Sequence, residues 1–164
     1  MVSIPPELAA SHLRTSCLKG DVLFWRGFEG KKQQRDSYFI LLTHCVNDSF
    51  IVARAARRVE HYSGAQAIRI KHEVVFLKKG EVSFFPDDTA IDLTWRDTFT
   101  LDKLAKLLGG AVTKRGSLPP AIMQRIDDAV RNSCTLSTRE INLILSCNQT
   151  TQPTGVIPEA GGSA

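Results

Sequence analysis

Arginine is concentrated in one short stretch of the chain. Arg54, Arg57 and Arg58 stand close together, and His61 follows them. The guanidinium group of arginine presents paired N–H donors that match phosphate oxygens, and histidine is the side chain that ordinarily titrates near neutral pH. These residue types are the ones needed to bind a phosphate group and to move a proton beside it. The alternative is a solvated rim in which the arginines pair with carboxylates and the histidine has no chemical role.

The arginine cluster stands among short runs of apolar, β-branched and aromatic residues that have the length of strands. Turn residues bound each run, which is typical of β-structure; the runs are Gly20–Gly27, Ser37–Thr43, Ser49–Ala53, Ala67–Ile70, Val74–Leu77, Val82–Phe85 and Ala90–Trp95. Successive short strands without helices between them predict an antiparallel sheet curled into a small barrel or sandwich. The nearly continuous apolar run 37–43 indicates a central strand buried on both faces. Residues 54–58 would fan out at a strand end, or gather on one face if the segment is helical.

Helical patterns lie before and after the strand region. The first follows Pro5-Pro6, because proline suits the first turn of a helix. After the strands, Thr100 is a predicted N-cap for a helix over 103–108. The clearest helix has an apolar stripe at helical spacing, formed by Ile122, Ile126, Ala129 and Val130. A capping-box pattern over 137–140 then predicts a final helix.

The composition is that of one globular domain with an ordinary core. The chain has 164 residues, of which 43% are hydrophobic and 23% are charged. We expect a lead-in over 1–19, a barrel domain with C-terminal helices over 20–147, and a disordered tail over 148–164, where Thr, Pro, Gly and Gln prevail. The net charge of +4 and the pI of about 9.0 permit binding to a polyanion without requiring it.

Cysteine and aspartate patterns give no metal motif. The cysteines are too far apart in the sequence for a zinc site and are expected to be reduced, mostly buried thiols; they are Cys17, Cys45, Cys134 and Cys147. Asp87, Asp88 and Asp92 follow Pro86 and are expected to form an exposed turn. We therefore predict neither a metal nor a cofactor. The N-terminus has no apolar signal core, and no apolar run reaches membrane-spanning length, so we expect a cytoplasmic protein without a membrane partner.

Two segments resemble the MazF/PemK-like toxins of type II toxin–antitoxin systems. Residues 109–126 match the family's last helix, which is introduced by a glycine, a small residue, an apolar residue and a proline. The segment Lys19–Trp25, with Gly20-Asp21 before apolar residues, is similar to the family's opening strand. The resemblance implies a mainly β fold with α (α+β), a small antiparallel β-barrel of the MazF/PemK/CcdB type with C-terminal helices. It further implies a homodimer that cleaves RNA without metal and is paired with an antitoxin.

The family resemblance also implies an arginine before the second strand and a Thr or Ser after the third. Arg35 is the nearest arginine, although Asp36 and not proline follows it, and residues 54–57 stand where the hydroxyl is expected. The nearest hydroxyls, on Thr43 and Ser63, do not match by position. RNA supplies its own nucleophile, the 2′-hydroxyl, so the enzyme needs a proton acceptor and a cation for the phosphorane charge. We expect Arg35 and His61 to be catalytic, and the RNA-binding residues to be Arg54, Arg57, Arg58, Arg69 and Lys71.

Two other functions fit the same sequence. The missing hydroxyl favours a catalytically inactive barrel that binds a peptide or protein partner in the groove where the toxins bind their antitoxins. The basic cluster also fits a nucleic-acid-binding regulator without catalysis. Salt-sensitive RNA binding without cleavage would identify the regulator, because phosphate contacts release counterions.

Overall fold

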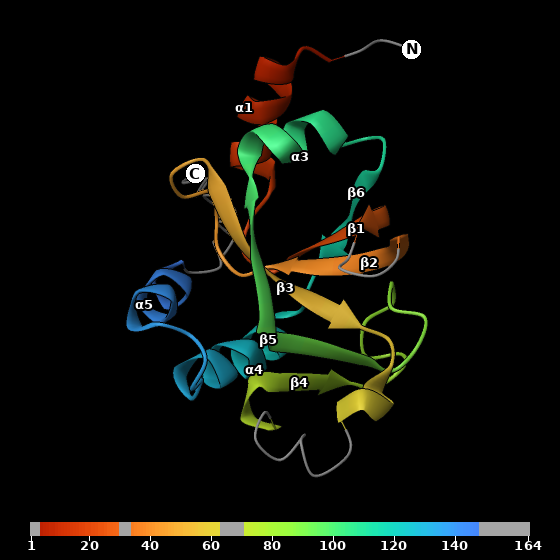
Figure 1. The fold of residues 1–164 in the computed structure, drawn as a ribbon, viewed down its shortest axis with the longest axis vertical. Coiled ribbons are helices and arrows are strands. Elements are labelled where there is room, and N and C mark those ends of the chain that lie inside the picture. Colours follow the sequence, from red (N-terminus) through yellow and green to blue (C-terminus); the bar gives the residue numbers. More distant parts are fainter. Residues whose placement is uncertain (1–3, 30–33, 63–70, 148–164) are drawn as a thin grey trace, which may run out of the picture.

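The computed structural model describes residues 4–29, 34–62 and 71–147 and shows an α+β fold (Figure 1). The strands are β1 (Asp21–Glu29), β2 (Gln34–Leu41), β3 (Ser49–Ala56), β4 (Val74–Leu77), β5 (Thr89–Thr100) and β6 (Val112–Ser117). The α-helices are α1 (Pro6–Ser16), α3 (Leu101–Leu107), α4 (Pro120–Arg131) and α5 (Thr138–Ser146), and the 3₁₀ helices are η1 (Val59–Tyr62) and η2 (Lys71–Glu73). The prediction of an antiparallel sheet with C-terminal helices is thus confirmed.

The six strands form one antiparallel sheet in the order β4-β5-β3-β2-β1-β6. Strands β4 and β6 end this order, and within the described part of the chain they do not pair with each other. The sheet is therefore open, and the predicted closure into a barrel is not seen.

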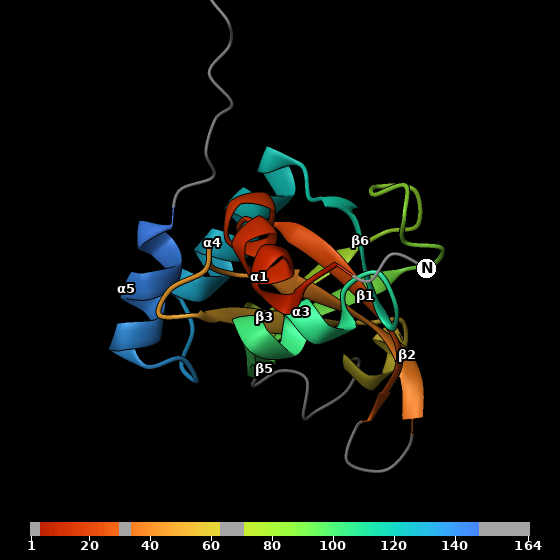
Figure 2. The same ribbon diagram turned by 90° about the horizontal axis from the view of Figure 1, so that it is seen from above.

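Both faces of the sheet are covered, because its central strands are apolar on both sides. In β2 the buried residues alternate: Tyr38 and Ile40 face one core, whereas Phe39 and Leu41 face the other. Helices α1 and α3 cover the second of these cores, and α4 and α5 cover the first (Figures 1 and 2). The predicted central strand, buried on both faces, is confirmed.

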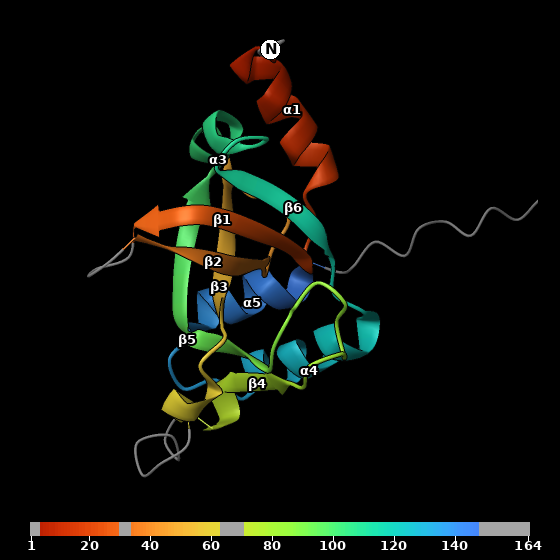
Figure 3. The same ribbon diagram turned by 90° about the vertical axis from the view of Figure 1, so that its right-hand side faces the viewer.

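Strand β5 is bent by an irregularity in its pairing with β3. Ala53 pairs with Arg96, but the next residue, Arg54, pairs with Asp92, so residues 93–95 are extra. The Asp92 carboxylate accepts hydrogen bonds from the backbone N–H groups of Thr94 (2.9 Å) and Trp95 (3.3 Å) and so stabilises the bulge. The strand changes direction here (Figure 3), which brings Trp95 to the end of β3.

The helix signals in the sequence are confirmed. Helix α1 follows Pro5, and the Thr100 hydroxyl accepts a hydrogen bond from Lys103 N–H at the start of α3. Helix α4 buries Ile122, Ile126 and Val130 against the sheet, each worth about 1.5–3 kcal/mol of burial. The Ser137–Glu140 capping box is present in α5. Within the described ranges, each helix is too short or too polar to span a bilayer.

A buried lysine ties the start of the sheet to both C-terminal helices. The Lys19 side chain is 2% exposed and lies 2.7 Å from the Asp127 carboxylate of α4. Its ammonium also donates a hydrogen bond to the Ile144 carbonyl of α5, at 2.9 Å. Because a buried charge is costly unless it is paired and hydrogen-bonded, these contacts fix where α4 and α5 sit.

Three details of the sequence prediction are wrong. Residues 82–85 form a turn in place of a strand, since Val82 and Phe85 both bury their side chains in the core and Phe85 N–H bonds back to the Val82 carbonyl. The polar, basic segment Phe28–Asp36 predicts an exposed hairpin loop, but Phe28 is a buried residue of β1. Asp92 is buried within β5, not exposed in a turn, because its carboxylate bonds inside the bulge.

Strand β6 was not expected, because its Lys114–Ser117 portion is polar. The predicted strand Ala67–Ile70 and the predicted disordered tail 148–164 lie outside the described residues. All four cysteines are free thiols, two of them buried, whereas Cys134 is exposed.

Candidate functional site

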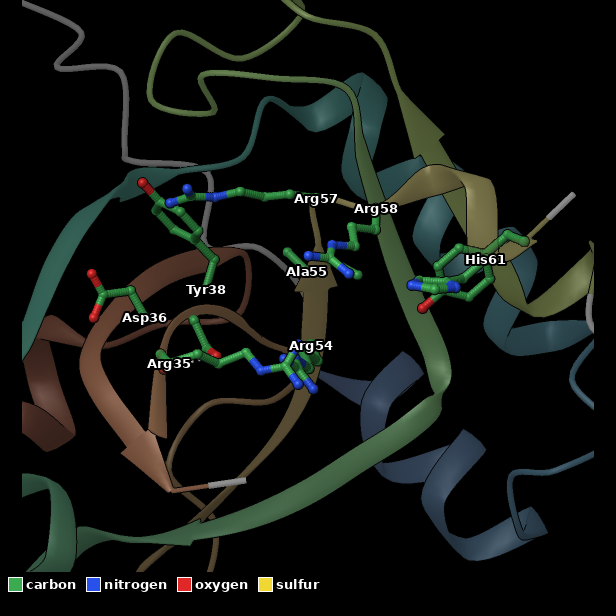
Figure 4. Close-up of a pocket in the computed structure, with 11 residues that line it drawn as sticks. Arg35, Asp36, Tyr38, Arg54, Ala55, Arg57, Arg58 and His61 are labelled. Carbon is green, nitrogen blue, oxygen red and sulfur yellow. Dashed lines mark hydrogen bonds between the residues drawn. The ribbon is translucent and has the colours of Figure 1, made fainter. Parts of the chain in front are cut away.

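A pocket of about 340 Å³ opens where β2 begins and β3 ends. Its lining comes from the first part of β2, the last part of β3 and the segment leading through η1; the residues are Arg35, Asp36, Ser37, Tyr38, Arg54, Ala55, Ala56, Arg57, Arg58, His61 and Tyr62. Five residues predicted from the sequence as functional therefore meet in one place, four of them arginines (Figure 4). We call this the arginine pocket.

The antiparallel pairing of β2 and β3 explains why these residues meet. Tyr38 lies opposite Ala55 in the register, so the start of β2 and the end of β3 share one edge of the sheet. Arg35 lies just before this pair, and Arg57 and Arg58 follow just after it. Residues 54–58 thus fan out from a strand end, and the helical alternative for this segment is wrong.

Arg54 is held in a partly buried position on an aromatic ring. Its guanidinium carbon lies 5.8 Å from the centre of the Trp95 ring, a cation–π arrangement. Its Nε is buried and has no hydrogen-bond partner among the residues that the structure describes. Burial lowers the pKa of Arg54 below its ordinary value, and the positive charge of Arg35 lowers it further. The group remains a cation, and the fold leaves one of its donors unused.

The other arginines of the pocket also lack an acidic partner among the described residues. Within residues 4–29, 34–62 and 71–147, neither Arg35, Arg54, Arg57 nor Arg58 forms an ion pair. Asp36 is the one acid in the lining, and its carboxylate accepts a hydrogen bond from the Gly27 N–H at 2.9 Å. The alternative of arginines paired with carboxylates therefore finds no support in this part of the chain.

Figure 4 shows how the cations are arranged around the opening. Arg35 and Arg54 reach toward each other, and Arg58 and His61 stand along the same rim. Arg57 lies against Tyr38, with its guanidinium carbon 5.3 Å from the ring centre. Four like charges around one hollow repel each other, so the arrangement favours an anion that fits between them.

Tyr62, which lines the pocket, forms a hydrogen-bonded pair with Asp92 of β5. The Tyr62 hydroxyl donates a hydrogen bond to Asp92 Oδ2 at 2.8 Å. Burial and this bond raise the pKa of Tyr62 above its ordinary value, so the phenol keeps its proton at neutral pH. Among the lining side chains, His61 is then the one suited to accept a proton. Sequence reasoning missed this pair, although Tyr62 directly follows His61.

Two predicted RNA-binding residues are not brought to the pocket. Arg69 lies outside the described residues. Lys71 lies in the 3₁₀ helix η2; its side chain is exposed and does not line the pocket. Thr43 is buried, and its hydroxyl accepts a hydrogen bond from Ile51 N–H, so its role is structural. Among the described residues, the aliphatic hydroxyl that lines the pocket belongs to Ser37.

The pocket brings together the residue types that bind anions. Within the described ranges, no three His, Cys, Asp or Glu side chains are grouped so that they would hold a metal ion. No protein-family model matches the sequence, and a search of curated proteins finds no match. Any function of the chain must therefore be inferred from its own residues.

Proposed function

We propose that this protein binds single-stranded RNA at the arginine pocket and cleaves it without a metal ion, in the manner of the MazF/PemK-like toxins. The observation that carries the proposal is the set of four arginines around one hollow that form no ion pair with the described residues, together with the unpaired Nε donor of Arg54. Guanidinium groups match the oxygens of a phosphodiester. We propose single-stranded and not double-stranded RNA because the pocket is recessed. A duplex holds its phosphates on a wide, rigid surface that cannot enter such a hollow.

The proposed reaction uses the 2′-hydroxyl of the RNA as nucleophile. His61 accepts the proton of that hydroxyl as its oxygen forms a bond to phosphorus, and the bond from phosphorus to the 5′-oxygen breaks. The departing 5′-oxygen takes up a proton from water, and the hydroxide that remains removes the proton from His61, so the products are a 2′,3′-cyclic phosphate and a 5′-hydroxyl and the histidine is again neutral. Arg35 and Arg54 stabilise the additional negative charge on the phosphorane.

The proposal departs from the family pattern at two points. The arginine at the start of the second strand is not followed by proline, and the hydroxyl expected after the third strand is absent. At that position β3 carries Arg54, which lies on the Trp95 ring at the bend of β5. We propose that Arg54 takes the place of this hydroxyl. Its positive charge would stabilise the phosphorane, where the hydroxyl would do so by donating a hydrogen bond.

The test is cleavage of a mixed-sequence single-stranded RNA by the full chain in EDTA. We expect cuts that leave 2′,3′-cyclic phosphate ends, and a loss of rate of at least about 100-fold in Arg35→Ala and in His61→Ala. The matched control is Arg139→Ala, which removes one exposed arginine of α5 outside the pocket and should leave the rate unchanged.

Binding is measured separately with an RNA whose 2′-hydroxyls are methylated, which cannot be cleaved by this route. Arg54→Ala should weaken this binding, and the affinity of the wild-type protein should fall as salt rises. Binding of RNA without cleavage would support the alternative function, a nucleic-acid-binding regulator. Neither binding nor cleavage by folded protein would overturn the proposal and favour a protein partner at the pocket.

A further inference from the structure

A row of cations and aromatic rings leads away from the arginine pocket across the sheet. It starts at Arg57 on the ring of Tyr38, and the Tyr38 ring lies 5.0 Å from that of Phe24 in the neighbouring strand β1. The row ends on Arg115 of β6, whose guanidinium carbon lies 4.6 Å from the centre of the Phe24 ring. Figure 3 shows strands β2, β1 and β6 side by side. We call these four residues the Arg57–Arg115 row.

The register of the sheet explains why the row is continuous. Tyr38 is the direct partner of Phe24, and Phe24 is the direct partner of Thr113 in β6. The pairing of β1 with β6 shifts between Val22 and Leu23, so Arg115 is an extra residue with no partner opposite. Such bulges change the direction of side chains, and here the bulge places Arg115 over the ring of Phe24.

Arg115 and its neighbour Lys114 have different surroundings. The Lys114 ammonium is 2.7 Å from the Asp21 carboxylate and donates a hydrogen bond to the Ser16 carbonyl. Arg115 is exposed and forms no ion pair within the described ranges. The lysine is thus used by the fold, whereas the guanidinium of Arg115 has its donors available for a ligand.

The rings serve as supports for the cations, not as stacking surfaces for bases. Tyr38 is 8% exposed and Phe24 is 9% exposed, so little of either ring can be reached. A guanidinium lies over each ring, and a cation held on an aromatic face loses less freedom when it binds an anion. The row therefore offers phosphate contacts that do not depend on base identity.

We infer that an RNA strand held at the arginine pocket continues from Arg57 across Tyr38 and Phe24 to Arg115, which binds a second phosphate. The inference rests on the proposed function, since it extends the path of the same strand. An anionic strand is the occupant that the row favours, because its two ends carry unpaired cations and no acid of the described residues pairs with them. Arg115 is a binding residue in this scheme and takes no part in the reaction.

The experiment compares a long and a short ligand. We expect Arg115→Ala to weaken binding of an eight-nucleotide 2′-O-methylated oligouridine about three- to tenfold, and to reduce the slope of log affinity against log salt by about 0.7. Binding of uridine 5′-monophosphate, which has one phosphate and occupies the arginine pocket alone, should not change. Arg115→Met keeps an unbranched side chain over Phe24 but removes the charge. If it weakens binding as much as Arg115→Ala does, the effect comes from the lost charge and not from lost packing on Phe24.

The outcomes separate this inference from the proposed function. If Arg115→Ala binds the octamer like the control Arg139→Ala, while Arg54→Ala still weakens it, the strand does not reach Arg115 and the inference is wrong. If the wild-type protein binds neither ligand, the proposed function itself fails. Equal weakening of both ligands by Arg115→Ala would also contradict the inference, because the effect would then come from the pocket.

Discussion

At the scale of single residues, the arginine pocket contains a charge that the fold does not neutralise. Arg54 is partly buried, its pKa is lowered by burial and by Arg35, and its Nε has no partner. A group whose charged form is disfavoured in the native state makes folding less favourable. An anionic ligand would bind to this same unneutralised charge. Removal of a positive charge from the pocket should therefore raise the stability of the protein and weaken its binding of an anion.

We predict that Arg35→Gln raises the free energy of unfolding while it weakens RNA binding. The substitution removes the like charge that faces Arg54 and keeps a polar side chain of similar reach, so the gain should be about 0.5 kcal/mol. Urea denaturation at low salt measures the stability, and anisotropy of a labelled RNA measures the affinity. In Arg139→Gln, which lies elsewhere on the surface, neither quantity should move. A loss of stability in Arg35→Gln would mean that Arg35 supports the fold.

The residues of the pocket were easier to predict from the sequence than their surroundings. The cluster Arg54–Arg58 with His61 is visible as a dense run of basic residues, and antiparallel pairing brings Arg35 to it. The support of Arg54 by Trp95 and the bond from Tyr62 to Asp92 depend on the bend of β5. No local sequence signal marks this bend, because the Asp92 carboxylate stabilises it through hydrogen bonds that form only in the folded sheet.

At the scale of elements, signals that act within one helix were predicted correctly, and those that depend on distant partners were not. The Thr100 N-cap and the Ser137–Glu140 capping box are local, and both occur as expected. Strand β6 has a polar half and forms because it pairs with β1. The apolar run 82–85 resembles a strand, but its side chains fill the core from a turn. Propensity was overridden by tertiary packing in both cases.

Helix α5 provides a prediction about pH. Glu140, 30% exposed, completes the capping box and accepts hydrogen bonds from Arg96, at 2.8 Å from Nε. The bond from Arg96, followed by the bonds from Ser137, lowers the pKa of Glu140 to about 2, below its ordinary 4.5. Because the folded pKa is depressed, the stabilisation is complete above pH 4.5 and is lost as the pH falls toward 2.

We therefore expect Glu140→Gln to cost about 1–2 kcal/mol at neutral pH and almost nothing near pH 2. The amide can still accept a capping bond, but it loses its charge toward Arg96. The measurement is the free energy of unfolding of both proteins across this pH range. Asp102→Asn, which breaks an exposed i,i+4 pair with Lys106, should cost less than about 0.5 kcal/mol. A pH-independent difference for Glu140→Gln would assign the effect to packing.

At the scale of the whole molecule, one sheet serves two cores. Helices α1 and α3 pack on one face and α4 and α5 on the other (Figure 2), and the same strands supply apolar residues to both. In β2, Phe39 belongs to the core under α1 and α3, and its neighbour Ile40 belongs to the core under α4 and α5. Both layers of helices pack on the same strands. Loss of either layer would expose one face of these strands and so weaken the sheet on which the other layer packs. The arginine pocket, at the edge of β2 and β3, depends on both.

We predict that Leu104→Ala in α3 and Ile126→Ala in α4 each lower the free energy of unfolding by about 2–5 kcal/mol, in a single transition. Both side chains are fully buried, on opposite faces of the sheet. Because the strands are shared, fluorescence and far-UV circular dichroism should report the same midpoint in each variant, and amide protection in β2 should fall equally in both. Two separated transitions, or loss of protection in α3 alone for Leu104→Ala, would show that the two layers unfold independently. In that case a ligand at the arginine pocket would stabilise only the layer that keeps the ends of β2 and β3 in place.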